Sequence, residues 1–278
     1  MKDLITSRQN PRVLAVCALA DKKKRRQTRL FRLDGIKLLR EACAARLAIE
    51  SVFVRDPISP SIDALLREAI EDGVLREEAV SLVSESVFDK ISEERSPEGV
   101  VTVAHCPDNL HLACDVASAI GQIGDGEKIL LVESLRDPGN LGTVMRSCAA
   151  LGIDRLILSD DCAELYNPKT VRSAMGALFR LPTVTVAGEE LPILIRLLRQ
   201  RGRRVFATAL REDAERIGSL ARSQGDCFVI GNEGHGLSGE AILACNDRVL
   251  IPMEQDCESL NAAIAASICM WELYKTDK

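Results

Sequence analysis

Three short segments in the second half of the sequence carry the polar side chains best placed to do chemistry. They read DPGNLGTVMRSC at 137–148, IGNEGHGL at 230–237 and IPMEQDCESLN at 251–261. Each combines glycine or proline with amide, hydroxyl or carboxyl groups near an expected strand end or helix start. The first backbone N–H groups of a helix lack partners within the helix, so they can bind polar side chains or a ligand. The three segments therefore predict a polar recognition site built from loops.

The first segment offers two candidates for contact with a substrate. Pro138 and Gly139 predict a turn, which places Asn140 at a helix start and Arg146 more than one turn inside that helix. Taken alone, Asn140 also suits a helix cap, and an arginine on a helix commonly faces solvent. The residue types alone leave both interpretations open.

The second segment places Gly231, Gly234 and Gly236 around Glu233. Glycine permits positive φ and close backbone approach, so this loop can lie against a ligand with Glu233 directed into the site. An ordinary turn with a solvated Glu233 is the alternative. A GxGxxG sequence that opens a helix is absent, which argues against a nicotinamide-dependent oxidoreductase. His235 is a lone histidine in this loop, and we do not expect it to act as a general base.

Alternating strand and helix signals from residue 128 onward supply the framework for these loops. Asn167 and Pro168 mark one helix start, as N-cap and first helical residue. Buried strands that alternate with helices predict an α/β fold with a mostly parallel sheet. The predicted strands include KILLVES, RLILSD, LPTVTV, RVFATAL, CFVIG and RVLIP.

The first part of the chain differs in charge and in pattern. Residues 1–40 hold 12 Lys and Arg against 3 Asp, a net charge of +9, which leaves −14 for the rest of a chain whose formal net charge is −5. This asymmetry predicts an end that faces nucleic acid, although a lone KKKRR tract also suits a solvated surface. We expect a basic arm at 1–28, a small α/β domain at 29–105, a linker at 106–127 and the parallel-sheet domain at 128–278.

In order and spacing, the three polar segments resemble the motifs of the SpoU/TrmH family of S-adenosylmethionine-dependent RNA ribose 2′-O-methyltransferases. The resemblance implies a trefoil-knotted α/β (SPOUT) methyltransferase domain after the linker. ITSRQNP near the start of the chain, and the order of elements in the domain at 29–105, resemble the family's RNA substrate-binding domain. FRLDG at 31–35 departs from the more usual phenylalanine–aliphatic–glutamate–glycine form, so individual RNA contacts there stay open.

The resemblance also implies roles for particular residues. The implied catalytic residues are Asn140, Arg146, Glu233, Ser259 and Asn261. The implied cofactor-binding residues are Thr208, Ala209, Leu210, Gly231, Ile251, Met253 and Leu260. The expected RNA-binding residues are Lys22, Lys23, Lys24, Arg25 and Arg26. Ser259 is also expected to cap the alanine-rich final helix.

Arg146 is implied to engage the RNA near the reacting ribose. Arginine stays charged and is a poor base, so a substrate phosphate is an alternative acceptor for the 2′-hydroxyl proton. The methyl group of S-adenosylmethionine is already activated on a sulfonium, which makes positioning the main task of the protein. The implied partners are RNA and a second copy of the chain that binds through the C-terminal domain. Ribosomal RNA is favoured over transfer RNA as the substrate.

Composition narrows the remaining possibilities. Ten cysteines are scattered without a CxxC pair, so we expect reduced thiols and no metal site. No apolar run approaches the roughly 18 residues that span a bilayer, and the polar N-terminus does not suit a secretory signal, so we expect a cytoplasmic protein. A non-catalytic RNA-binding or ribosome-assembly factor on the same fold is the alternative from another functional class.

Overall fold

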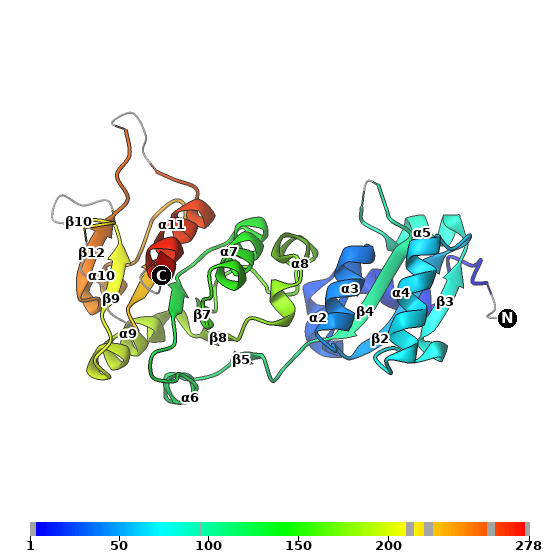
Figure 1. Ribbon diagram of the computed structural model, residues 1–278, viewed down its shortest axis with the longest axis horizontal. Helices are drawn as coiled ribbons and strands as arrows, with labels where there is room; N and C mark the ends of the chain where they lie inside the picture. Colours follow the sequence, from blue (N-terminus) through cyan, green and yellow to red (C-terminus); the bar gives the residue numbers. More distant parts are fainter. Residues whose placement is uncertain (1–3, 95, 210–213, 220–224, 255–258, 276–278) are drawn as a thin grey trace. The chain divides into compact units, whose positions relative to one another are not determined.

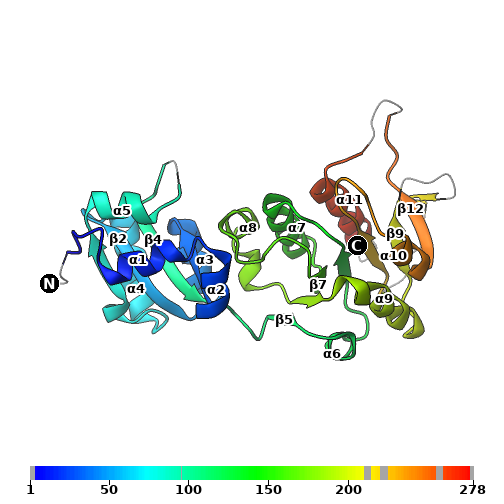
Figure 2. The same ribbon diagram turned by 180° about the vertical axis from the view of Figure 1, so that it is seen from behind.

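The computed structural model describes residues 4–94, 96–209, 214–219, 225–254 and 259–275. The chain forms two compact units (Figures 1 and 2). The first comprises Met1–Pro107 and Tyr166–Phe179, and the second comprises Asp108–Leu165 and Arg180–Lys278. The chain therefore passes between the units three times, and each unit is described by itself below.

The first unit is built on a four-stranded mixed sheet with the order β1-β4-β2-β3. Its β2–β3 pair is parallel, and the other two pairs are antiparallel. The strands are β1 (Leu30–Asp34), β2 (Ile49–Arg55), β3 (Val80–Val83) and β4 (Val100–His105). The helices are α1 (Pro11–Ala18), α2 (Lys22–Thr28), α3 (Ile36–Ala44), α4 (Pro60–Glu71), α5 (Glu85–Ile91) and α8 (Pro168–Ala174), with short 3₁₀ turns at η1 (Glu77–Ala79) and η2 (Ala177–Phe179).

Helices cover both faces of this sheet. Val52 and Val54 of β2 pack with apolar residues of α3 and α4, whereas Phe53 belongs to the other core and packs with α1 and α5. Side chains alternate along a strand, so one run of apolar residues fills two cores. The unit is a three-layer α/β/α arrangement.

The basic start of the chain is part of this core. Val13 and Val16 of α1 are buried at helical spacing, and the side chain of Asn10 caps that helix. Asp21 caps α2 in the same way. The expected basic arm therefore contains two helices, α1 and α2, and α1 is anchored by apolar side chains.

A segment from the later sequence completes the first unit. Phe31 of β1 lies 4.9 Å from Tyr166 and 6.2 Å from Phe179, measured between ring centroids. Arg172 of α8 donates a hydrogen bond of 3.0 Å to Glu94. The expected domain at 128–278 therefore contains a piece, Tyr166–Phe179, that folds with the N-terminal unit instead.

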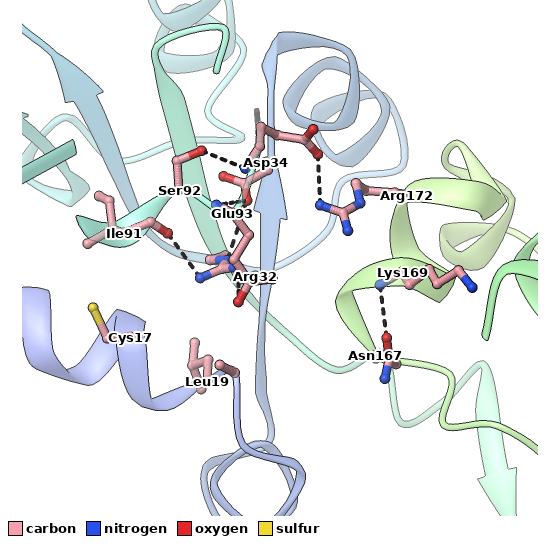
Figure 3. Close-up of polar contacts among 12 residues, drawn as sticks. Cys17, Leu19, Arg32, Asp34, Ile91, Ser92, Glu93, Asn167, Lys169 and Arg172 are labelled. Carbon is pink, nitrogen blue, oxygen red and sulfur yellow. Dashed lines mark hydrogen bonds and ion pairs between the residues drawn. The ribbon is translucent and has the colours of Figure 1, made fainter. Parts of the chain in front are cut away.

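Figure 3 shows a cluster of charged residues around Arg32 in this unit. Arg32 donates a 2.9 Å hydrogen bond to the Ile91 carbonyl and lies 2.7 Å from a carboxylate oxygen of Glu93 and 3.6 Å from one of Asp34. The Arg32 and Asp34 side chains are only 4% and 5% exposed. Burial raises the pKa of Asp34, and the neighbouring Arg32 only partly opposes that rise. Two residues of the unusual FRLDG segment thus pair internally.

The second unit is built on a sheet to which eight strands of the described chain contribute, with the order β10-β12-β9-β11-β6-β7-β8-β5. Each neighbouring pair is parallel. The mostly parallel sheet predicted from the sequence is confirmed. The strands are β5 (His111–Ala113), β6 (Ile129–Val132), β7 (Arg155–Ser159), β8 (Thr183–Val186), β9 (Val205–Thr208), β10 (Glu215–Arg216), β11 (Cys227–Ile230) and β12 (Asp247–Leu250).

Helices again pack on this sheet. The helices α6 (Val116–Gly121), α9 (Leu191–Gln200) and α10 (Gly239–Ala244) share one apolar core with inward residues of the central strands, and η3 (Gly188–Glu190) leads into α9. The helices α7 (Pro138–Ala150) and α11 (Ala262–Tyr274) pack on each other, and α11 also packs on β11 (Figure 1). Cys148 and Met270 meet between α7 and α11, with 3.4 Å between their sulfur atoms.

The segment 106–127, expected to be a linker, is largely part of the second unit. Strand β5 pairs with β8 at the edge of the sheet, and Val116, Ala119 and Ile123 are buried in its core. The apolar residues of this segment are spaced as in a helix and are buried. The Pro, Asn and Gly residues around them favoured the prediction of a linker. Among the described residues, no helix is long and apolar enough to cross a membrane, and the nine described cysteines carry free thiols.

Candidate active site at the carboxyl edge of the parallel sheet

Four neighbouring strands, β12, β9, β11 and β6, end at the same edge of the sheet. Ligands of open parallel sheets bind outside the carboxyl ends of the strands. Ile251 follows β12, Ala209 follows β9, Gly231 follows β11 and Glu133 follows β6. Residues from the expected cofactor-binding set therefore converge on one edge although they are far apart in the sequence.

A chain of hydrogen bonds joins the three polar segments at this edge. The Asn140 side chain donates through Nδ2 to the Glu233 carboxylate at 2.8 Å. Its Oδ1 accepts a bond of 3.0 Å from Nδ2 of Asn261. Three of the five residues in the expected catalytic set are thus in direct contact, each supplied by a different segment.

The residues that cap α7 and α11 differ from the ones expected. Asp137, not Asn140, caps α7, because its carboxylate accepts the Asn140 backbone N–H at 2.8 Å. Asn261 caps α11 through Oδ1, which accepts the N–H groups of Ala263 and Ile264. The prediction that Ser259 caps the last helix is therefore wrong. Asn261 takes that position because its own shorter spacing to the helix start lets Oδ1 reach those N–H groups.

Gly231 is a close-approach position, but within its own loop. A Cβ there would overlap the backbone of Gly236 and Leu237. The loop closes on itself through two hydrogen bonds of 3.0 Å between the backbones of Asn232 and Gly236. Any side chain at 231 would therefore disturb the loop that carries Glu233, whether or not it also met a ligand.

The other expected cofactor-binding residues fit an apolar, partly open wall. Thr208, Ala209, Ile251, Met253 and Leu260 are all half-buried. The Thr208 hydroxyl already donates its proton to the Val229 carbonyl at 2.8 Å, so toward a ligand Thr208 can offer its hydroxyl oxygen only as an acceptor, besides its methyl group and backbone. Half-buried apolar groups beside free strand ends suit the adenosine part of S-adenosylmethionine. Leu210, also in this expected set, lies outside the described residues.

The remaining expected catalytic residues lie on the surface. Arg146 is exposed on α7, and its side chain makes no hydrogen bond or ion pair with another described residue. Ser259 is exposed before α11. Arg146 lies more than one turn inside α7, and its charge is available to a polyanionic substrate. His235 is also exposed, and its backbone N–H binds the Asn232 side chain.

The expected RNA-binding residues of the first unit divide into two kinds. Lys22, Lys23, Lys24 and Arg26 are exposed on α2. Lys22, Lys23 and Arg26 line an open hollow of about 350 Å³ together with Gln27. Arg25 has to be removed from this set: it is 3% exposed and donates to the carbonyls of Leu19 and Ala20 at 2.7 and 2.8 Å. It holds the end of α1, so it is not free to contact phosphate.

Sequence reasoning missed residues that hold the second polar loop. The buried Glu133 accepts two hydrogen bonds of 2.7 Å from Ser238, one from the backbone N–H and one from the hydroxyl. Asn232 donates to the Ser134 carbonyl at 2.7 Å. The signal available in the sequence was a polar pair, Glu133 and Ser134, directly after the aliphatic run of β6. Among the described residues, no group of His, Cys, Asp or Glu could hold a metal ion.

Comparison with known proteins agrees with this geometry. The SpoU rRNA Methylase family model matches residues 127–271, and the MRM3-like substrate binding domain model matches residues 10–102. The chain belongs to the SpoU rRNA methylase family. The resemblance inferred from the three polar segments is confirmed, and with it an RNA methyltransferase that uses S-adenosylmethionine.

Relatives and solved structures span almost the whole chain. The chain is 29% identical to 23S rRNA (guanosine(2553)-2′-O)-methyltransferase RlmP of Bacillus subtilis, over 97% of this chain and 98% of the relative. The AdoMet-bound rRNA methyltransferase from Sinorhizobium meliloti matches with a TM-score of 0.81 and 27% identity, over 99% of this chain and 98% of that one. The SpoU methyltransferase AviRb from Streptomyces viridochromogenes, in complex with AdoMet, matches with a TM-score of 0.78 and 26% identity, over 96% and 99%.

Proposed function

We propose that this SpoU methyltransferase methylates a ribose 2′-hydroxyl of ribosomal RNA in the cytoplasm. The observation that carries the proposal is the Glu233–Asn140–Asn261 hydrogen-bond chain at the carboxyl edge of the parallel sheet. It puts neutral amides and a carboxylate beside a half-buried apolar wall. A relative named for 23S rRNA, RlmP of Bacillus subtilis, shares nearly the full length of the chain and supports ribosomal RNA as the substrate.

S-adenosylmethionine supplies an activated methyl group, so the residues of the chain have to align the acceptor and manage one proton. In the proposed site, Thr208, Ala209, Ile251, Met253 and Leu260 hold the cofactor, and Gly231 shapes the loop beside it. Asn140 and Asn261 orient Glu233 and the ribose. Arg146 binds a phosphate next to the reacting ribose and holds that phosphate where it can accept the 2′-hydroxyl proton.

We assign RNA capture to the exposed cations of α2. Lys22, Lys23 and Arg26 line one hollow, and no acidic residue lines it among the described residues. Binding phosphates releases counterions, so the affinity for RNA should fall as salt rises. Changing Lys22, Lys23, Lys24 and Arg26 to Gln, with Arg25 kept, should weaken RNA binding and lower the salt slope by about 1 for each phosphate that the variant no longer binds.

The matched control for that experiment changes Arg67 and Arg76 to Gln. Both side chains are exposed in the same unit, at 73% and 68%, and lie on or after α4. Filter binding to ribosomal RNA at several salt concentrations measures affinity and slope. An unchanged slope in the α2 variant, or an equal change in the control, would contradict an RNA surface on α2.

We further propose a homodimer that buries the outer face of α11. Ile264 and Trp271 are 53% and 52% exposed on a helix that is apolar on nearly every side. Such a helix is normally covered. Trp271→Glu should give a monomer by sedimentation velocity, with the fold retained by circular dichroism. A dimer that persists in this variant would place the interface elsewhere.

We also propose that the second unit contains the family's trefoil knot. The support is topological: β12 lies near one edge of the sheet, yet the following helix α11 returns to pack on α7 and β11. An experimental structure that traces residues 251–262 tests whether the chain is threaded through a loop.

The experiment that tests the proposed function is a map of 2′-O-methyl positions in total RNA, made with and without the gene. One ribosomal position should lose its methyl group, and the purified protein should restore it in ribosomal RNA from the deletion strain. Loss of a transfer RNA position instead would redirect the substrate assignment. If no position changed, the chain would be an RNA-binding assembly factor on the same fold.

A further inference from the structure

A serine in a left-handed backbone conformation lies directly behind the proposed active site. Ser134, the second residue after β6, has a φ of +56°. Residues other than glycine rarely adopt this conformation, and Asn and Asp are the usual exceptions. Strain of this kind persists where the surrounding structure fixes it, and it gathers at functional sites.

Every polar group of Ser134 is fixed by a partner. Its N–H donates to the Ser159 hydroxyl at 2.8 Å, and its own hydroxyl donates to Asp161 at 2.6 Å. Ser159, which is fully buried, donates to the other oxygen of Asp161 at 2.6 Å. The Ser134 carbonyl accepts the bond of 2.7 Å from Nδ2 of Asn232. The Asp161 carboxylate thus accepts hydrogen bonds from both serine hydroxyls.

These contacts reach the proposed catalytic residues in two directions. Through Asn232, Ser134 is joined to the loop that carries Glu233, since Asn232 Oδ1 also accepts the Gly234 N–H at 2.7 Å. Along the chain, Ser134 lies three residues before Asp137, which caps the helix that carries Asn140. Both members of the Asn140–Glu233 pair are therefore connected to Ser134.

The neighbouring residues close the arrangement. The Glu133 N–H donates to the Ile230 carbonyl at 2.8 Å, where the second loop begins, and the Glu133 carboxylate holds Ser238, where it ends. The Leu135 carbonyl accepts the Ala163 N–H at 2.8 Å. The stretch 133–135 is thus a rigid base from which both catalytic loops are held.

We infer that Ser134 and Asp161 are positioning residues of the methyl transfer: they set the distance between Asn140 and Glu233 through Asn232 and the start of α7. The inference rests on the proposed function of the Asn140–Glu233–Asn261 site. Neither residue touches substrate or cofactor in this role. Misplacing a reacting group by about 1 Å can cost about 100-fold in rate, so a hub of this kind has a measurable effect on catalysis.

The test compares variants by kcat, KM for RNA and cofactor affinity, with tritiated methyl transfer to ribosomal RNA from the deletion strain. Ser134→Ala keeps the strained backbone and removes the bond to Asp161. Asp161→Ala removes the anchor. Both should lower kcat about 10- to 100-fold, with cofactor affinity and RNA KM within about 3-fold of wild type. Asp161→Asn keeps one acceptor oxygen and should recover part of that decrease.

Asp154→Ala is the matched control. Its carboxylate accepts the Lys128 N–H at 2.8 Å at the opposite, amino-terminal edge of strands β6 and β7. It therefore removes a similar contact to the same pair of strands, remote from the site. Its kcat should stay at the wild-type value, and thermal unfolding of all variants shows that each is folded at the assay temperature.

A double-variant cycle separates positioning from a purely structural role. If Ser134 acts through Asn140, then Ser134→Ala should add less than about 3-fold to the decrease caused by Asn140→Ala, because residues that act as a unit are not additive. An unchanged kcat in Ser134→Ala, or full multiplication of the two decreases, would overturn the inference. If Asn140→Ala itself kept wild-type activity, the proposed site would fail instead, and the two failures are distinguishable.

Discussion

The two units use polar side chains in opposite ways. Around Arg32 in the first unit, opposite charges are buried against each other with side chains 4% and 5% exposed (Figure 3). Around Asn140 in the second unit, two neutral amides and one carboxylate form an open chain at a loop edge. Breaking the first cluster would leave an unpaired charge in the core, whereas breaking the second would expose groups to water that they already meet. The first cluster should therefore govern stability, and the second should govern activity.

The largest expected effect is the loss of soluble protein when the first 104 residues are deleted. A simple division into N- and C-terminal domains predicts that deleting residues 1–104 leaves the C-terminal domain intact, but Tyr166, Val171 and Phe179 are buried in the first unit. The deletion would leave these side chains without their apolar neighbours. We expect the truncated protein to be insoluble on expression.

A second truncation makes that prediction specific. Replacing residues 166–179 with a Gly-Ser linker in the deleted chain removes the stranded apolar side chains and should restore soluble protein. Soluble yield and light scattering measure both forms. A soluble, monodisperse protein from the simple deletion would show that the segment does not depend on the first unit.

Arg32→Met should be the most damaging single substitution in the first unit. It leaves Asp34 buried without its cation, which costs about 3–5 kcal/mol in comparable buried pairs. Hydrogen exchange of β1 and β4 follows this unit, while the fluorescence of Trp271, the single tryptophan of the chain, follows the second. Arg32→Met with Asp34→Leu should recover most of the stability. If Arg32→Met were as stable as wild type, the charged cluster around Arg32 would not contribute to the stability of the first unit.

Arg146→Ala should separate activity from stability in the second unit. An exposed arginine without a partner among the described residues contributes little to the fold, so unfolding should not change. Turnover should fall by about 100-fold or more, equivalent to about 2.7 kcal/mol, with cofactor affinity unchanged by calorimetry. Arg196→Ala, on the exposed side of α9, is the control. Near-normal methylation by Arg146→Ala would remove this residue from the mechanism.

Local signals explain what the sequence predicted well. Six strands of the second unit, all except β5 and β10 of the described ones, follow short apolar runs that the sequence predicts, and the α8 start follows Asn167 and Pro168, because both signals lie within a few residues of their effect. The chain of Asn140, Glu233 and Asn261 could be anticipated only through the family resemblance. It joins residues 93 and 121 positions apart, and nothing in spacing alone sets such contacts.

The features that the sequence did not predict depend on tertiary contacts. Arg25 stands in a run of five cations, and only the fold shows that it caps α1 while its neighbours face water. The apolar residues of 166–179 are spaced as in a helix, but this spacing does not indicate which of the two cores they join. Glu133 and Ser134 look like the end of a strand until the second loop is placed beside them. Each of these assignments needed a partner from a distant part of the chain.

The smallest expected effect is a pair of opposite pH dependences. Burial raises the pKa of Asp34 above its ordinary 3.8, so its contribution to stability is present at low pH and is lost as pH rises through the folded-state value. Burial also acts to raise the pKa of Asp161, but hydrogen bonds from Ser134 and Ser159 and the charge of Arg136 outweigh it and lower that pKa below 3.8. The contribution of Asp161 is therefore present at neutral pH and lost as pH falls through the folded-state value.

Asparagine substitutions make the two signs visible. Relative to wild type, Asp34→Asn should gain stability as pH rises from about 3 to 7, whereas Asp161→Asn should lose stability over the same range, since a neutral amide cannot follow either titration. Denaturant unfolding at several pH values measures both, with hydrogen exchange reporting on the first unit and Trp271 fluorescence on the second. Each difference must flatten above the pH at which its carboxyl group is fully ionised. Slopes of the same sign would show that the two carboxylates sit in equivalent environments, and the contrast between a buried charge cluster and a hydroxyl-bound anchor would then disappear.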